Sequence, residues 1–102
     1  MHELPPVPES LDLTAVLQCF ADPIRLQIIA DLNQTDDLEC GTFNVPVTKS
    51  TLSHHFRILR EAGVISTTKV GTRSLNRLRR NELDAAFPGL LDAVLVNARK
   101  AH

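Results

Sequence analysis

The chain has few cysteines and no long apolar run. Its two cysteines, Cys19 and Cys40, are too few for a disulfide framework, and their separation is unlike the close pairs of a zinc site. No stretch approaches the roughly 18 consecutive apolar residues of a membrane span. The first residues lack both the basic and the apolar segment of a signal peptide. We therefore expect no membrane partner and a cytoplasmic location.

The sequence also lacks the motifs of common enzymes. It has no serine elbow, no phosphate-binding glycine loop and no pair of carboxylates that suggests acid–base catalysis. The adjacent His54 and His55 are poorly placed to chelate one ion, because neighbours on a helix point about 100° apart and helical metal pairs use i, i+4 spacing. We expect neither an enzyme nor a bound metal or cofactor.

Length and proline content set the expected domain boundaries. The 102 residues, 43% of them apolar, are enough for one compact core but not for two. Several prolines disfavour a helix in residues 1–9, which we expect to form a flexible arm. Residues 10–98 are expected to form a single domain, and residues 99–102 a short tail.

Charge is strongly segregated along the chain, although the net charge is only −1. Residues 1–48 carry eight acidic side chains against Arg25 alone, whereas residues 49–80 carry eight basic side chains against Glu61 alone. A basic block of this kind is the footprint expected of a phosphate-binding surface. A solvated basic face without a partner would have the same composition.

The first half of the chain predicts two helices. Apolar residues recur at helical spacing from Leu13 to Phe20, and Ser10 is placed to cap that helix. Asp22 followed by Pro23 is a strong start signal, because aspartate accepts from free N–H groups while proline lacks a donor that would be left unpaired. We expect this second helix to run to about residue 32. Residues 38–47 allow at most a short helix.

The second half predicts a capped helix and a β-hairpin. Thr48 is the expected N-cap of the clearest helix, which has one apolar face and ends at Gly63. Two β-type runs follow, residues 64–69 and residues 74–78, joined by a turn that contains glycine and basic residues. This pattern indicates a β-hairpin with a basic tip.

The last segment repeats apolar residues at helical spacing, interrupted by Pro88. We expect a short helical turn to about Ala86 and then a new helix with Pro88 as its first residue. The late apolar series is longer than a small core can easily cover, so we expect it to form a homodimer interface together with the first helix. The expected interface residues are Leu13, Val16, Leu17 and Phe20 in the first helix and Leu90, Leu91, Val94 and Leu95 in the last.

The order of these elements is that of a winged helix-turn-helix, a mainly α fold with a β-hairpin wing. In this fold the capped helix enters the major groove and the hairpin touches the flanking backbone. His55 lies between the polar and apolar arcs of that helix, where a residue that orients the helix is favoured over a direct DNA contact. The expected DNA-binding residues are Lys49, Ser50, Thr51, Ser53, His54 and Arg57 in the helix and Lys69, Thr72 and Arg73 in the hairpin.

The stretch KSTLSHHFRILREAGVISTTKVGTRS, residues 49–74, resembles the recognition helix and wing of the ArsR family of winged-helix repressors. It matches the family pattern S-x-x-S-H-H-[LF]-x-x-L-R-x-A-G-[LVI]. With ADPIRLQIIADL before it and FPGLLDAVL after it, the likeness covers most of residues 13–96. The resemblance implies a transcriptional repressor that dimerises through its first and last helices, binds an inverted-repeat operator in duplex DNA, and is released by a metal, an oxidant or another small signal.

The signal itself stays open. Soft-metal sensors of the family often carry E-L-C-x-C-D-L at the third helix, whereas DDLECGTFN offers only Cys40 here. Other members hold a metal on the last helix, for which Asp84, Asp92 and His102 are an incomplete set. A redox switch at Cys40, alone or with Cys19, is one alternative, although the apolar neighbours of Cys19 favour a core role. A metal, another ligand and no dedicated signal are the others.

A different class of function fits some of the same features. In this alternative the chain is a helical protein–protein interaction module, with the last helix paired to another protein and the basic face bound to an acidic partner. Binding of duplex DNA, compared with a polyanion control, separates the two hypotheses.

Overall fold

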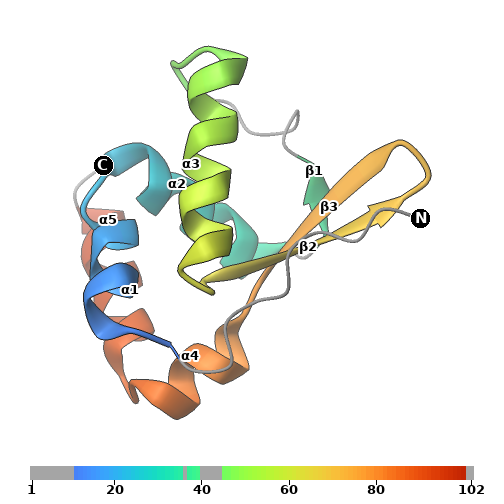
Figure 1. Cartoon of the computed structure of the whole chain (residues 1–102). Helices are drawn as coiled ribbons and strands as arrows, with labels where there is room; N and C mark the ends of the chain where they lie inside the picture. Colours follow the sequence, from blue (N-terminus) through green and yellow to red (C-terminus); the bar gives the residue numbers. More distant parts are fainter. Residues whose placement is uncertain (1–10, 36, 40–44, 101–102) are drawn as a thin grey trace.

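The computed structural model describes residues 11–35, 37–39 and 45–100 (Figure 1). The order of its helices and strands confirms the predicted mainly α fold with a hairpin wing. Helix α5 runs past the domain boundary expected at residue 98, and the expected N-terminal arm lies outside the described residues. The elements are α1 (Leu13–Phe20), α2 (Pro23–Gln34), β1 (Leu38–Glu39), α3 (Lys49–Glu61), β2 (Ile65–Val70), β3 (Arg73–Leu78), α4 (Arg80–Ala86) and α5 (Leu90–Lys100).

Aspartates cap the first two helices. The cap of α1 is Asp12 rather than the expected Ser10, and its carboxylate accepts from the Thr14 hydroxyl at 2.6 Å and from the Ala15 amide at 3.1 Å. These two hydrogen bonds lower the pKa of Asp12. Asp22 caps α2 with Pro23 as the first helical residue, as predicted. No single helix among the described residues is long and apolar enough to cross a membrane; α1 and α2 reach that length only as a pair bent by 97°.

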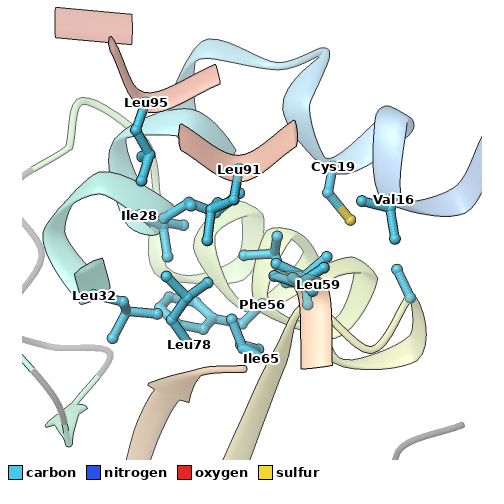
Figure 2. Packing of buried hydrophobic residues seen from close by; sticks show 14 of the residues in the cluster. Val16, Cys19, Ile28, Leu32, Phe56, Leu59, Ile65, Leu78, Leu91 and Leu95 are labelled. Carbon is cyan, nitrogen blue, oxygen red and sulfur yellow. The ribbon is translucent and has the colours of Figure 1, made fainter. Parts of the chain in front are cut away.

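The core lies where the helices meet the base of the hairpin (Figure 2). Leu52, Phe56 and Leu59 face it from α3, as their spacing predicts. Burial of such side chains stabilises the fold by about 1.5–3 kcal/mol each. The apolar side chains that are buried almost completely are Val16, Cys19, Ile28, Ile29, Leu32, Phe56, Leu59, Val64, Ile65 and Leu91.

The structure corrects part of the expected dimer interface. Val16, Leu91 and Leu95 are buried in the core of the single chain (Figure 2), so a second copy cannot reach them. The spacing correctly predicts that α1 and α5 are helices. Both helices carry apolar residues on more than one face, and spacing alone does not show which face is buried. Of the other expected interface residues, Leu13 and Leu17 are 45% and 43% exposed, and Phe20, Leu90 and Val94 are partly buried. Val96 of α5, which was not expected at the interface, is 54% exposed.

The junction between α4 and α5 also differs from the expectation. Helix α5 begins at Leu90, and Pro88 lies in the turn before it. Gly89 has a φ of 83°, a left-handed conformation that ends any helix begun at Pro88. The carbonyl of Gly89 accepts from the amide of Ala93 at 3.1 Å and so starts α5.

The hairpin forms close to the predicted boundaries. Strands β2 and β3 pair antiparallel from Ile65 opposite Leu78 to Val70 opposite Arg73, which leaves Gly71 and Thr72 as a two-residue turn. Gly71 has a φ of 64°, as this tight connection requires. The hairpin projects from the body of the protein beside α3 (Figure 1).

A third strand was not expected. Strand β1 pairs with β3, which places β3 in the middle of a small antiparallel sheet of order β1-β3-β2. The fully buried Asn76 joins the three strands, because its amide donates to the Leu38 carbonyl at 2.9 Å and accepts from the Thr67 hydroxyl at 2.7 Å. Strand β1 lies in the segment of residues 38–47, for which the sequence predicts at most a short helix.

Candidate nucleic-acid interface

Helix α3 turns a polar face to solvent. Thr48 caps it as predicted, with its hydroxyl oxygen accepting from the Thr51 amide at 3.2 Å, and Gly63 follows its end with a φ of 82°. Because the apolar face of α3 is held in the core, the opposite face is fixed in an outward orientation. All six residues expected to contact DNA from this helix are exposed: Lys49, Ser50, Thr51, Ser53, His54 and Arg57.

Arg57 is the charged residue at the centre of this exposed face. Its Nε lies 3.7 Å from a carboxylate oxygen of Glu61, one turn further along, and both side chains are about two-thirds exposed or more. Exposed pairs of this kind stabilise a helix by only about 0.3–0.5 kcal/mol. Glu61 therefore does not prevent Arg57 from binding another anion.

His55 faces inward, as the favoured interpretation required. The residue is buried, with 7% of its surface exposed, which argues against the alternative of a direct DNA contact. Its Nδ1 lies 3.1 Å from Nη1 of Arg25, and its Nε2 lies 4.0 Å from Asp22. Sequence reasoning gave Arg25 no role, although its position as the only cation among eight acids in the first half was a signal.

The tip of the hairpin is exposed and basic. Lys69, Thr72 and Arg73 are all exposed there, together with Val70 at 52%. Within the described residues Lys69 has no ion partner. Arg73, by contrast, is hydrogen-bonded through Nε to the carboxylate of Glu39 in β1.

Strand β1 and the residue before it bring two acidic side chains against β3, the middle strand of the sheet. Beside the pair of Arg73 and Glu39, Arg77 lies 2.9 Å from the carboxylate of Asp37. All four side chains are more than a third exposed, so these pairs are worth little to stability. The two acidic side chains neutralise Arg73 and Arg77, which belong to the basic block of residues 49–80.

Two further arginines of the basic block hold the body of the protein together. Arg79 is largely buried and donates to the Gly63 carbonyl at 3.0 Å. Arg80 donates to Asn33 of α2 at 2.6 Å and is hydrogen-bonded to Asp92 of α5, which raises the pKa of Arg80. These two residues, which were not among the expected DNA contacts, therefore add to the charge of the basic block without adding to the exposed basic surface around α3 and the hairpin tip.

Cys19 is a core residue. It is fully buried, with Sγ 4.0 Å from the Ile58 carbonyl, and burial raises the pKa of its thiol to about 11. A buried, protonated thiol is a poor nucleophile, which argues against Cys19 as part of a redox sensor. Cys40 lies outside the described residues, as does His102. The described parts of the chain bring together no group of three or more metal-ligating side chains.

An apolar groove lies between the first two helices and α5. It has a volume of about 360 Å³ and opens widely to solvent. Its walls come from α1, α2 and α5, the face away from the hairpin. The lining residues are Phe20, Leu26, Ala93, Val94, Asn97 and Ala98.

Comparison with known proteins points to one group of regulators. The model of the family described as "Bacterial regulatory protein, arsR family" matches residues 42–67, which include all of α3. The uncharacterized HTH-type transcriptional regulator YceK of Bacillus subtilis is 32% identical over 82 residues, 78% of this chain and 82% of its own. The arsenical resistance operon repressor of Staphylococcus xylosus is 32% identical over 78 residues, 72% of this chain and 71% of its own.

Solved structures share the fold. The transcriptional repressor BigR from Xylella fastidiosa superposes with a TM-score of 0.66 at 24% identity, over 83% of this chain and 84% of its own. An ArsR-like transcriptional regulator from Rhodococcus sp. RHA1 gives a TM-score of 0.65 at 22% identity, over 87% and 85% of the two chains. The likeness extends over the helices and the hairpin together rather than over one motif.

Proposed function

Because the chain belongs to the ArsR family of winged helix-turn-helix repressors, we propose that it binds operator DNA as a homodimer, with α3 in the major groove and the hairpin on the flanking backbone. The protein is a DNA-binding transcriptional regulator, like its relatives, and not an enzyme. The observation that carries the docking proposal is the outward polar face of α3, which is fixed by the burial of Leu52, Phe56 and Leu59 on the opposite side.

On this proposal α3 supplies the base contacts. Ser53 and His54 present short donors and acceptors that suit base edges in the major groove, and Ser50 and Thr51 extend the same face. Arg57 is positioned further along to reach a guanine or a phosphate. Lys49, at the positive N-terminal end of the helix, suits a phosphate oxygen.

The hairpin supplies backbone contacts. Thr72 lies in the two-residue turn and Lys69 and Arg73 lie beside it, so the tip is the part of the wing proposed to reach the DNA. A cation there attracts phosphate whatever the base sequence, and such contacts position the protein without specifying the site.

A second copy completes the DNA-binding form. We assign it to α1 and α5, which carry the exposed apolar side chains Leu13, Leu17 and Val96 and contribute to the walls of the apolar groove. Exposed apolar side chains gathered on one face are typical of a protein–protein interface. A two-fold dimer presents two α3 helices, and its preferred operator is then an inverted repeat with half-sites about one helical turn apart.

Release by a small signal and action in the cytoplasm are the remaining parts of the proposal. Within the described residues the thiol of Cys19 is buried and no metal cluster occurs, so Cys40 is the thiol that a redox signal would use. A ligand of another class is the alternative.

Selection of bound fragments from random duplex DNA at near-physiological salt tests the proposal. The wild-type protein should enrich an inverted repeat, and an Asn81→Ala control, altered at an exposed position on α4, should enrich the same sequence. Parallel selections with oxidant and with divalent metals should identify a signal by loss of that enrichment. Failure to enrich any sequence, with binding no stronger than to a heparin control, would contradict the proposal and favour the protein–protein interaction module.

A further inference from the structure

One arginine side chain joins the first helix to α3. Nη2 of Arg25, in α2, donates to the carbonyl of Gln18 in the last turn of α1 at 2.8 Å. Nη1 of the same guanidinium lies 3.1 Å from Nδ1 of His55 in α3. Helices α1, α2 and α3 all pack against one another, and Arg25 adds a directional polar link to that packing.

The chemistry of the two partners defines the link. A guanidinium only donates hydrogen bonds, so Nδ1 of His55 must accept, and the proton of the neutral ring is then on Nε2. Nε2 lies 4.0 Å from the carboxylate of Asp22. Partial burial alone would raise the pKa of Asp22, but hydrogen bonds from the amides of Arg25 and Ile24, together with the electrostatic effect of the neighbouring Arg25 and His55 side chains, lower that pKa. The buried imidazole is thus set between a fixed donor and an ionised carboxylate.

Burying this arginine has a cost that the two hydrogen bonds must offset. Nε of Arg25 is buried and has no hydrogen-bond partner in the described parts of the chain. A buried donor without a partner is destabilising, and an apolar side chain at this position would avoid it. Its two terminal nitrogens bond to different helices, which indicates that Arg25 fixes geometry as well as filling space.

His55 is adjacent to the side chain proposed to read bases. The rings of His54 and His55 have centroids 6.2 Å apart and planes 50° apart; the first ring is exposed and the second is buried. A rotation of α3 about its axis that released His55 would move His54 and Ser53 in the groove. His55 thus joins Leu52, Phe56 and Leu59 as a buried side chain that sets the rotation of α3.

We propose that Arg25 is a positioning residue for DNA recognition: it fixes the rotation of α3 through His55 and ties α3 to α1, a helix of the proposed dimer face. This inference rests on the proposed role of α3 as the recognition helix. Its consequence is that sequence discrimination depends on a side chain of α2, which lies outside the recognition helix.

Paired substitutions at the two ends of the link test this role. His55→Leu and Arg25→Met remove the hydrogen bond with little change in volume, whereas His55→Asn keeps an acceptor oxygen near the position of Nδ1. Affinity for operator and for scrambled duplex is measured at a temperature at which circular dichroism shows each variant folded. His55→Leu and Arg25→Met should each reduce the ratio of the two affinities about tenfold, the loss of roughly one base contact.

Two further variants give the test its controls. The double variant should lose no more discrimination than either single one, because both remove the same bond, and His55→Asn should recover most of the ratio. Arg60→Met, which removes a charge from α3 at a position without an ion partner among the described residues, should leave the ratio unchanged. If Arg25→Met does not fold, Arg25→Lys, which cannot span both acceptors, takes its place.

The outcomes separate this inference from the proposed function. A purely structural role would lower the melting temperature and leave the ratio of affinities in the folded protein at its wild-type value, which would overturn the inference. If the wild type itself does not discriminate between the duplexes, the proposed function fails. A third outcome would show that the positioning role alone is wrong. In that case the wild type discriminates between the two duplexes and His54→Ala does not, but Arg25→Met and His55→Leu keep the wild-type ratio of affinities.

Discussion

Helix α3 and the hairpin differ in the chemistry that each offers to DNA. Around His54 the helix presents mainly uncharged donors and acceptors on a rigid face. The hairpin presents cations, and one of them, Arg73, is already paired with Glu39 of the same chain. Uncharged groups on α3 can discriminate between bases but attract phosphate weakly, whereas a cation at the hairpin tip attracts phosphate whatever the base sequence. The comparison teaches that base discrimination is assigned to the uncharged groups of α3, whereas electrostatic affinity is shared between the hairpin tip and the cations Lys49 and Arg57 of α3.

The largest expected effect concerns the proposed dimer, in which both elements would be present twice. Leu91→Glu places a charge without a partner in the core and should unfold the chain, since such a charge costs several kcal/mol. Leu17→Glu, at an exposed position of α1, should leave the chain folded and dissociate the dimer. Circular dichroism and analytical ultracentrifugation of the two variants check this. A monomeric wild type at micromolar concentration, or a dimeric Leu17→Glu variant, would place the interface elsewhere.

The next effect is on the salt dependence of binding. If a dimer neutralises about six to eight phosphates through Lys49, Arg57, Lys69 and Arg73, log K should fall with log salt at a slope of about −5 to −7. Lys69→Ala should reduce the magnitude of this slope by about two, one for each copy. Ser53→Ala should leave the slope unchanged. Titrations of one duplex at several salt concentrations measure these slopes, and a wild-type slope near zero would exclude the docking.

A smaller effect is expected where the hairpin meets β1. Glu39→Gln removes the carboxylate bonded to Arg73, so the guanidinium becomes available to phosphate. Affinity for operator and scrambled duplex should rise together, by less than about 1 kcal/mol because the pair is exposed. Glu82→Gln, which removes the same charge near the buried Arg79, is the matched control and should not alter affinity. Unchanged binding by Glu39→Gln would show that Glu39 does not compete with DNA.

The smallest expected effect concerns the thiols. Under reducing conditions Cys40→Ser should bind DNA as the wild type does. In that variant the remaining Cys19 should resist thiol reagents in the folded protein and react only after unfolding, because burial keeps its pKa near 11. A mass-spectrometric labelling time course checks this. An oxidant response that persists in Cys40→Ser would exclude Cys40 as the sensor.

Local signals in the sequence predicted the elements that carry the DNA-binding residues. Thr48 and the pair of Asp22 and Pro23 mark helix starts through hydrogen bonds within one turn, and Gly63 marks a helix end. The hairpin follows from a short turn between two β-type runs. Such features depend on residues a few positions apart, so they can be read without knowledge of the tertiary structure.

Features that depend on distant contacts could not be predicted in this way. Strand β1 has only two residues, Leu38 and Glu39, and no period to detect; it exists because β3 and the side chain of Asn76 pair with it. The prediction that Val16, Leu91 and Leu95 belong to the dimer interface is wrong for the same reason. Burial of Leu91 depends on the packing of α5 against α2, which the spacing within α5 does not contain. Charge count likewise overstated the binding surface, because Arg80 is held by Asn33 and Asp92.

In the proposed docking, α3 contacts bases and the hairpin contacts phosphates. This assignment is tested most directly by measuring the affinity of His54→Ala and Arg73→Ala for operator and scrambled duplexes at several salt concentrations. A base contact carries about 1–3 kcal/mol of discrimination, whereas a phosphate contact weakens all sequences alike and lowers the salt slope by about one. His54→Ala should therefore narrow the gap between the duplexes at an unchanged slope. Arg73→Ala should weaken both together and flatten the slope. This assignment would be contradicted if His54→Ala weakened binding to both duplexes equally and Arg73→Ala abolished the difference in affinity between them. That result would assign base recognition to the hairpin.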